Sequence, residues 1–245
     1  MLRVLGWFGL VVLVVFVLPV ALQAALHWRA ASAAWRGADR SSAGLLPSAG
    51  PDTPAVVRVF AARTVSWRGL VAVHSWVVVK EAGGTYERYD LTAWGEPIRV
   101  NGFPPDGRWF GQVPQAVLSL DGGDASAAIA PIKAAIASYR YRHTGDYNAW
   151  PGPNSNTFVA TLMAAIPHLA EALPSTAIGK DYPVDGRWFG PTPSGTGLRF
   201  TLGGYAGLTV AWVEGLQLNL LGLVAGIDLR RPALWLPAIG RIGWA

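Results

Sequence analysis

The segment from Val4 to Leu26 contains no charged residue, and only Pro19 and Gln23 interrupt its apolar character. Its length matches the hydrocarbon thickness of a bilayer, so it predicts a membrane-spanning helix. A cleaved signal peptide is the competing interpretation, but its apolar region would be shorter, and the small residues 31–33 offer only a late cleavage site. We therefore expect residues 1–27 to be a transmembrane anchor or signal-anchor, with the bilayer as partner of residues 4–26.

The arginines around this segment do not determine its orientation in the membrane. Arg3 precedes it, while Arg29, Arg36 and Arg40 follow it, so they do not place the main chain on one side. We expect the inner membrane, with the remaining chain facing the periplasm or the cell exterior. The net charge of +5 comes from scattered residues, and solubility or contact with anionic lipid explains it without a nucleic-acid partner.

Composition divides the rest of the chain into a linker and a foldable region. Residues 28–54 are expected to be a flexible tether, because Gly37 to Pro54 is rich in Ser, Gly, Pro and Ala without apolar periodicity. Residues 55–245 are expected to form a single α+β domain in which an antiparallel sheet packs with helices. Its first part predicts strands at 56–62, 70–80 and 86–91, and helices at 124–139 and 157–173.

The C-terminal part predicts further strands at 198–202 and 208–220, because apolar residues alternate there with polar ones. Glu214 falls on the apolar face of the second strand. Either Gly215 marks a bulge that turns this carboxylate outward, or Glu214 is buried against a partner. Residues 215–227 are uncharged but too short to cross a membrane, so we expect a packed sheet and no second span.

Ser155 lies in the stretch WPGPNSNTF, which begins at Trp150 and ends at Phe158. The turn residues 151–153 must end any preceding element, and the apolar spacing that follows places Ser155 at a helix N-terminus. The free N–H groups and the dipole of that helix end can stabilise an anionic nucleophile or an oxyanion. Capping explains the same residues without chemistry, because Asn and Ser are preferred N-caps.

His74 interrupts the strongly strand-forming run from Ala72 to Lys80. Such a histidine usually makes only a structural hydrogen bond, but it can also serve as general base for a nearby serine. A third group would then fix the imidazole tautomer, and Asp90 or Tyr89 on the next strand can reach it, depending on register. Asn154 can supply a side-chain donor to the oxyanion.

Other chemistries find little support in the residues. The chain has no cysteine, which excludes disulfides, thiolate metal ligands and a cysteine nucleophile. The other histidines show no metal-ligand spacing, and no glycine-rich stretch has the lysine of a phosphate loop. We therefore expect neither a metal nor another cofactor.

The hexapeptide Asp-Gly-Arg-Trp-Phe-Gly occurs twice, at 106–111 and at 185–190. Asp-Gly predicts a turn in each copy, and the flanking segments do not match. The side chains of Arg108, Trp109, Arg187 and Trp188 either line a groove for a sugar or an acyl chain, or plug the edge of the core. Trp150 and Asn156, beside Ser155, complete the predicted binding residues.

A strand histidine followed far downstream by a helix that opens Asn-Ser-Asn-x-Phe resembles the circularly permuted papain-like superfamily. Lecithin retinol acyltransferase relatives and certain cell-wall peptidases belong to that group. The resemblance implies a permuted papain-like fold with His74 as base and Ser155 at the nucleophile position, where relatives carry cysteine. The segments RGLVAVHSWVVVK, YDLTAWGEPIRV, YNAWPGPNSNTFV and TAIGKDYPVDGRWFG, between about Arg68 and the C-terminus, also resemble an uncharacterised bacterial membrane-associated family.

Two functions follow as hypotheses. One is a membrane-anchored acyl or amide hydrolase, or an acyltransferase, in which His74 activates Ser155 because a serine hydroxyl is too hard to ionise without a base. The other keeps the fold without the reaction, as an envelope module that binds a glycan, a peptide or a lipid.

Overall fold

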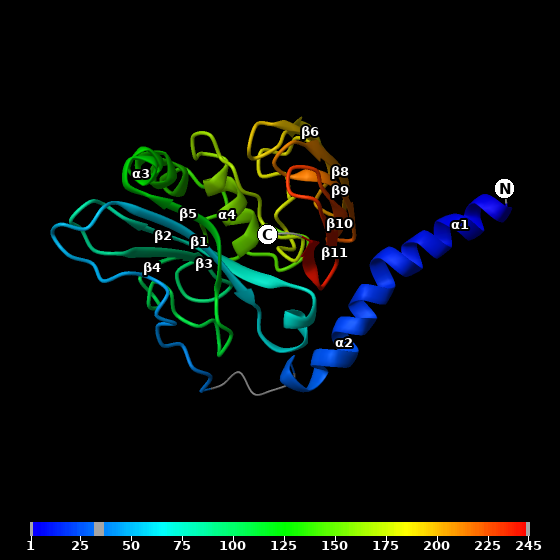
Figure 1. Cartoon of the computed structure of the whole chain (residues 1–245), viewed down its shortest axis with the longest axis horizontal. Helices are drawn as coiled ribbons and strands as arrows, with labels where there is room; N and C mark the ends of the chain where they lie inside the picture. The colour runs from blue at the N-terminus through cyan, green and yellow to red at the C-terminus, as the bar shows by residue number, and fades with distance from the viewer. Residues whose placement is uncertain (1, 32–36, 244–245) are drawn as a thin grey trace.

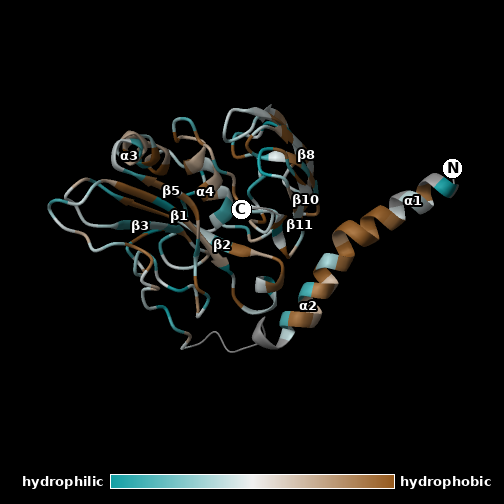
Figure 2. Cartoon of the chain, in the orientation of Figure 1, coloured by the Kyte–Doolittle hydropathy of each residue, from teal (hydrophilic) through white to brown (hydrophobic). Residues whose placement is uncertain are grey.

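The computed structural model describes residues 2–31 and 37–243, which form an N-terminal helix and an α+β part with two antiparallel sheets (Figure 1). The helix runs through three consecutive segments, α1 (Leu2–Val12), the π-helical η1 (Leu13–Val17) and α2 (Leu18–Ala31). Within it, Leu5–Trp28 is long and apolar enough to cross a membrane, which fits either a membrane anchor or a signal sequence. Figure 2 shows how predominantly hydrophobic this helix is.

The first sheet has the strand order β4-β3-β2-β1-β5. Its strands are β1 (Val56–Arg63), β2 (Val73–Lys80), β3 (Glu87–Leu91), β4 (Ile98–Val100) and β5 (Gln115–Asp121). The 3-10 helix η2 (Ser66–Leu70) joins β1 to β2, so the strand predicted from Leu70 begins three residues later. Valine-rich β1 and β2 lie in the middle of the sheet, where both faces of a strand are covered.

Helices α3 (Gly122–Ala137) and α4 (Ser155–Met163) cover one face of this sheet and form the main hydrophobic core with it. Strand alternation directs Val77 and Val79 toward the helices. Trp76 and Val78 point to the opposite face, where they pack with Trp109 from the loop between β4 and β5. Helix α4 ends well before the predicted position at Leu173, because Pro167 disfavours a helical conformation of the residue before it.

The second sheet has the order β12-β11-β10-β9-β8-β7-β6, so that each strand pairs with its neighbour in sequence. Its strands are β6 (Phe189–Pro191), β7 (Gly197–Leu202), β8 (Ala206–Ala211), β9 (Gly215–Leu220), β10 (Leu223–Asp228), β11 (Ala233–Leu236) and β12 (Gly240–Gly243). Arg63 at the end of β1 donates to Ala238 O (2.6 Å), which joins the two sheets.

The single strand predicted at 208–220 is wrong, because β8 and β9 form a hairpin there. Gly215 begins β9 with a φ of 76°, a conformation that favours glycine and ends the turn. Glu214 is buried in that turn and accepts hydrogen bonds from Ser194 N (2.9 Å) and Ser194 Oγ (2.6 Å). The partner of this carboxylate is therefore a serine from the segment between β6 and β7.

Residues 39–46, between the N-terminal helix and β1, are held against the domain. Leu45 N donates to Asp106 Oδ2 (2.6 Å), and Arg108 donates to Ser42 O (2.7 Å). Leu46 packs against the cluster that contains Trp109, on the face of the first sheet away from the helices. Residues predicted as a tether thus form hydrogen bonds and apolar contacts with the first Asp-Gly-Arg-Trp-Phe-Gly copy.

Candidate functional site

Asn154 and Thr157 define the start of α4 through a reciprocal cap. Asn154 Oδ1 accepts from the backbone N–H groups of Asn156 (2.9 Å) and Thr157 (3.2 Å), while Asn154 N donates to Thr157 Oγ1 (3.1 Å). The amide group of Asn154 also donates to Ala149 O and Ile178 O, at 3.0 Å each. Asn154 is therefore the N-cap, and its side-chain donors are occupied by protein carbonyl groups.

Gly179 permits the close packing of this cap. A Cβ atom there would lie 2.3 Å from Asn154 Nδ2, and the φ of 96° is one that residues with a side chain rarely adopt. Thr157 Oγ1 donates to Gly179 O (2.7 Å), which brings the same loop against the first turn of α4. The first turn is buried and its geometry is fixed from both sides.

Asn156 joins this helix end to the strand that carries His74. Its Oδ1 accepts from Ser75 Oγ (2.8 Å), and its Nδ2 donates to Val73 O (2.9 Å) and to Ile178 O (2.8 Å). The residues on both sides of His74 therefore bond to the residue that follows Ser155. Asn156, predicted to bind substrate, is 2% exposed and positions β2 against α4.

The imidazole of His74 belongs to a buried cluster on the face of β2 away from α4. Asp90 Oδ1 lies 2.9 Å from His74 Nε2, and Arg88 donates to Asp90 Oδ2 from Nε (2.7 Å) and to Oδ1 from Nη2 (2.9 Å). The ring of Trp109 stacks on the imidazole with their centroids 3.6 Å apart and their planes at 8°. Bonded to an ionised Asp90, Nε2 carries the proton and Nδ1 the lone pair.

Burial and charge act in opposite directions on the two groups of this pair. Burial lowers the pKa of His74 below its ordinary value, despite the neighbouring Asp90 carboxylate. Burial alone would raise the pKa of Asp90, but the hydrogen bond from His74 and the charge of Arg88 outweigh it and hold that pKa below its ordinary value. Near neutral pH, His74 is therefore neutral and Asp90 is ionised.

Register decides between the two predicted partners of His74. Val77 pairs with Tyr89, which directs the Tyr89 side chain toward the helices, and its hydroxyl donates to Glu87. Asp90 falls on the same face as His74. Of the two, the structure brings Asp90 to the imidazole, and Tyr89 lies on the other side of the sheet.

His74 and Ser155 both line a cavity of about 280 Å³ at the end of β2. Ser155 is 3% exposed and interacts with Tyr147. Burial raises the pKa of Tyr147, and hydrogen bonding with Ser155 opposes that rise. Among the described residues, no hydrogen bond joins the His74 ring to the Ser155 hydroxyl. The structure thus brings the two residues to one cavity, with the imidazole bonded to Asp90 and the hydroxyl beside Tyr147.

The remaining wall of this cavity is mostly apolar. Its side chains come from η2 and the residue after it, from the turn before α4, from the segment between α4 and β6, and from the turn into β10: Trp67, Val71, Trp150, Ile178, Leu221 and Leu223. Trp150 donates from Nε1 to Leu221 O (2.9 Å), which holds two of these segments together. Arg68 also lines the cavity, and its charge acts on the pKa of Tyr147.

The other predicted binding residues do not line this cavity. Trp109 is buried against His74, and Arg108 holds the segment at Ser41 and Ser42 through its guanidinium group. Arg187 and Trp188 are exposed beside β6 in the second sheet. Sequence reasoning missed Tyr147 and Arg68, although only two residues separate Tyr147 from the WPGPNSNTF stretch.

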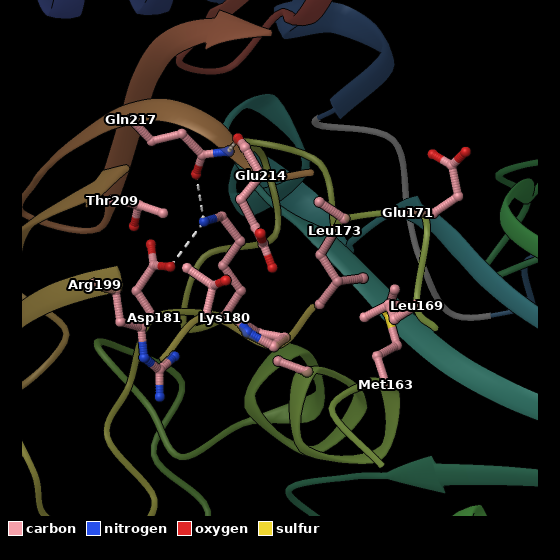
Figure 3. A pocket seen from close by; sticks show the side chains of 14 residues that line it. Met163, Leu169, Glu171, Leu173, Lys180, Asp181, Arg199, Thr209, Glu214 and Gln217 are labelled. Carbon is pink, nitrogen blue, oxygen red and sulfur yellow. Dashed lines mark hydrogen bonds and ion pairs between the residues drawn. The ribbon is translucent and has the colours of Figure 1, made fainter. Parts of the chain in front are cut away.

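A second, small cavity of about 30 Å³ lies between α4 and the inner face of the second sheet. Lys180 Nζ donates there to Asp181 Oδ1 and Gln217 Oε1, both at 2.8 Å, as Figure 3 shows. This volume is close to the space of a single water molecule. Around this cavity, the inner face of the second sheet is polar and its side chains bond to one another.

A comparison with models of protein families gives a match. The model of a family described as a protein of unknown function, DUF3750, matches residues 54–182, which is more than half of the chain. No curated protein and no solved structure matches this chain.

Proposed function

Since the chain belongs to DUF3750, a family of unknown function, we propose from its geometry that it is a membrane-anchored module that binds an amphipathic ligand with an acyl chain. The supporting observation is the cavity of about 280 Å³, whose apolar wall surrounds the Ser155 and Tyr147 hydroxyl groups and Arg68. Apolar walls with a few convergent polar groups are typical of small-molecule sites. Arg68 suits an anionic or strongly polar headgroup at the rim.

Binding is favoured over catalysis by the state of the imidazole. A base must reach the serine hydroxyl, whereas His74 donates from Nε2 to Asp90 and its ring face is stacked on Trp109. The alternation of β2 sends this ring away from the face on which Ser75 contacts α4. Ser155 then serves as a hydrogen-bond donor to a ligand.

The full chain in detergent should bind a fluorescent polyunsaturated fatty acid, which serves as an anionic amphipathic probe. Replacing half-buried Ala72 in the cavity wall with tryptophan is expected to weaken binding at least about tenfold by occupying the apolar space. The matched control Ala127→Trp, at an exposed position of α3, should leave affinity unchanged. Equal affinities of both variants would refute binding in this cavity.

Acyl transfer through Ser155 is the second candidate, and the shared cavity with an Asp90-oriented histidine favours it. His74 would take the hydroxyl proton at Nδ1 as Ser155 attacks an acyl carbon, and would return it to the departing alcohol or amine as the acyl-enzyme forms. The Asn154 cap occupies the N–H groups of Asn156 and Thr157, so the Ser155 N–H would hold the oxyanion. Such bonds often tighten only with substrate bound. A fluorophosphonate probe should then label the wild-type chain, and Ser155→Ala and His74→Ala should abolish labelling, while the absence of wild-type labelling would reject this candidate.

The permuted papain-like relationship and the location in the inner membrane are part of the proposal. The order of strand and helix, with α4 held against β2 by Asn156, supports the first. The apolar helix Leu5–Trp28 supports the second. Protease digestion of intact spheroplasts should remove the α+β part if it faces the periplasm or exterior, and its complete protection would reject that orientation.

A further inference from the structure

The outer face of the second sheet carries an apolar row that runs across six strands. The ladder pairs Leu198 with Val210, Val210 with Leu216, Leu216 with Ile227, Ile227 with Leu234, and Leu234 with Ile242. Each of these six side chains is between 40% and 52% exposed. A second row, Phe200, Leu208 and Leu218, lies directly beside it and is equally open. We call these nine residues the outer apolar face.

On β7, β8 and β9 the inner face has the opposite character. Thr201, Thr209, Gln217 and Asn219 alternate with the residues of the outer apolar face, and all four are buried. An antiparallel sheet with one solvated face normally turns its apolar side chains inward and its polar ones outward. Strands β7 to β9 reverse that pattern, which indicates that the outer face has an apolar cover in the working protein.

We propose that the outer apolar face rests on the lipid bilayer into which the N-terminal helix inserts. The helix brings a membrane to this side of the molecule, because η1 contacts β10 and α2 contacts η2. In Figure 1 the helix leaves the domain on the side of β8 to β11, and Figure 2 shows hydrophobic residues on both. The ladder hydrogen bonds stay within the sheet, so the surface meets lipid with side chains alone.

Aromatic residues at the ends of these strands fit the same orientation. Tyr205 lies in the turn between β7 and β8, and Trp212 lies in the turn between β8 and β9, so they mark opposite ends of the hairpins. Both are exposed. Tyr and Trp favour the boundary between headgroups and acyl chains, where one end of the ring is apolar and the other is wet.

Single cysteines test this placement directly, because the chain has none of its own. Val210→Cys and Leu234→Cys in the full chain would carry an environment-sensitive fluorophore in phosphatidylcholine and phosphatidylglycerol nanodiscs. The matched control is Val100→Cys on β4, since Val100 is 54% exposed and Val210 is 52% exposed. We expect doxyl-labelled lipid to quench the two second-sheet labels and aqueous iodide to quench only the control.

Two results would overturn the proposal. Iodide quenching of Val210→Cys and Leu234→Cys equal to that of Val100→Cys would show a face open to water. Efficient crosslinking of Val210→Cys between two copies, with no quenching by doxyl lipid, would assign the face to a second copy of the chain. Neither result depends on whether the cavity beside Ser155 binds a ligand.

Discussion

Trp109 and Trp188 occupy the same position in two identical hexapeptides, yet Trp109 is 3% exposed and Trp188 is 60% exposed. In the first copy, Asp106 accepts from Leu45 N, and Trp109 stacks on His74. In the second copy, Asp185 accepts from Arg187 N, two residues along the same turn. The same six residues are thus buried in the core in the first copy, where residues near Leu45 cover them. In the second copy they form an exposed local turn.

The comparison also separates the two sheets. The first copy belongs to a sheet whose two faces are covered, by α3 and α4 on one side and by Trp109 and its neighbours on the other. The second copy adjoins a sheet whose outer face carries exposed apolar side chains. Burial of the motif is set by its tertiary partners rather than by its own six residues.

Truncation of the two tryptophans should give the largest difference in the free energy of unfolding. Trp109→Ala removes a buried aromatic side chain and leaves a cavity beside His74, so we expect a loss of about 3–5 kcal/mol in the free energy of unfolding. Trp188→Ala should stay within about 0.5 kcal/mol. Denaturant unfolding of the full chain in detergent, followed by circular dichroism, measures both. Similar losses in the two variants would break the contrast.

His74, which stacks on Trp109 of the first copy, should give the next largest effect on stability. The pKa of His74 is lower in the folded chain than its ordinary value of 6.5. As the pH falls through 6.5, His74 therefore binds a proton in the unfolded chain before it does so in the folded chain. The free energy of unfolding should therefore decrease as the pH is lowered from 7 to 5, by at most about 1.4 kcal/mol per pH unit. His74→Gln should flatten this slope. An unchanged slope in His74→Gln would contradict the assignment.

The two arginines should show the smallest contrast. Arg108→Ala removes donors to Ser42 O and Ser41 Oγ, and we expect a loss of about 1 kcal/mol together with faster proteolysis near residues 39–46. The side chain of Arg187 is 76% exposed, with Asp185 3.9 Å away, so Arg187→Ala should change neither stability nor proteolysis. Limited trypsin digestion with mass spectrometry, compared against unfolding curves, distinguishes the two. Unaltered cleavage in Arg108→Ala would show that other contacts hold the segment.

Local patterns in the sequence predict the elements that have strong local signals. The apolar N-terminal helix, the valine-rich strands and the start of α4 at Ser155 all follow from periodicity, length and capping residues. The α+β class with antiparallel sheets is confirmed. Register is not local, which is why the sequence left Asp90 and Tyr89 as alternatives until the pairing of Val77 with Tyr89 separated them.

The sequence pattern could not predict contacts between residues that lie far apart in the chain. The stacking of Trp109 on His74 joins residues from a strand and a distant loop, and no local signal marks it. The same holds for Asn156, which lies beside Ser155 in sequence but bonds to both neighbours of His74. The hairpin at 208–220 was missed because apolar alternation continues through β8 and β9, and only the conformation of Gly215 divides them.

The place of the apolar row within the chain bears on how the protein is made. During translation, the helix Leu5–Trp28 leaves the ribosome long before β6 to β12 do. If that helix has already entered the membrane, the outer apolar face emerges last and beside lipid, which limits its exposure to water. Moving the helix to the far end of the chain would release the sheet into water first, and we expect such a permuted gene to yield inclusion bodies instead of membrane protein.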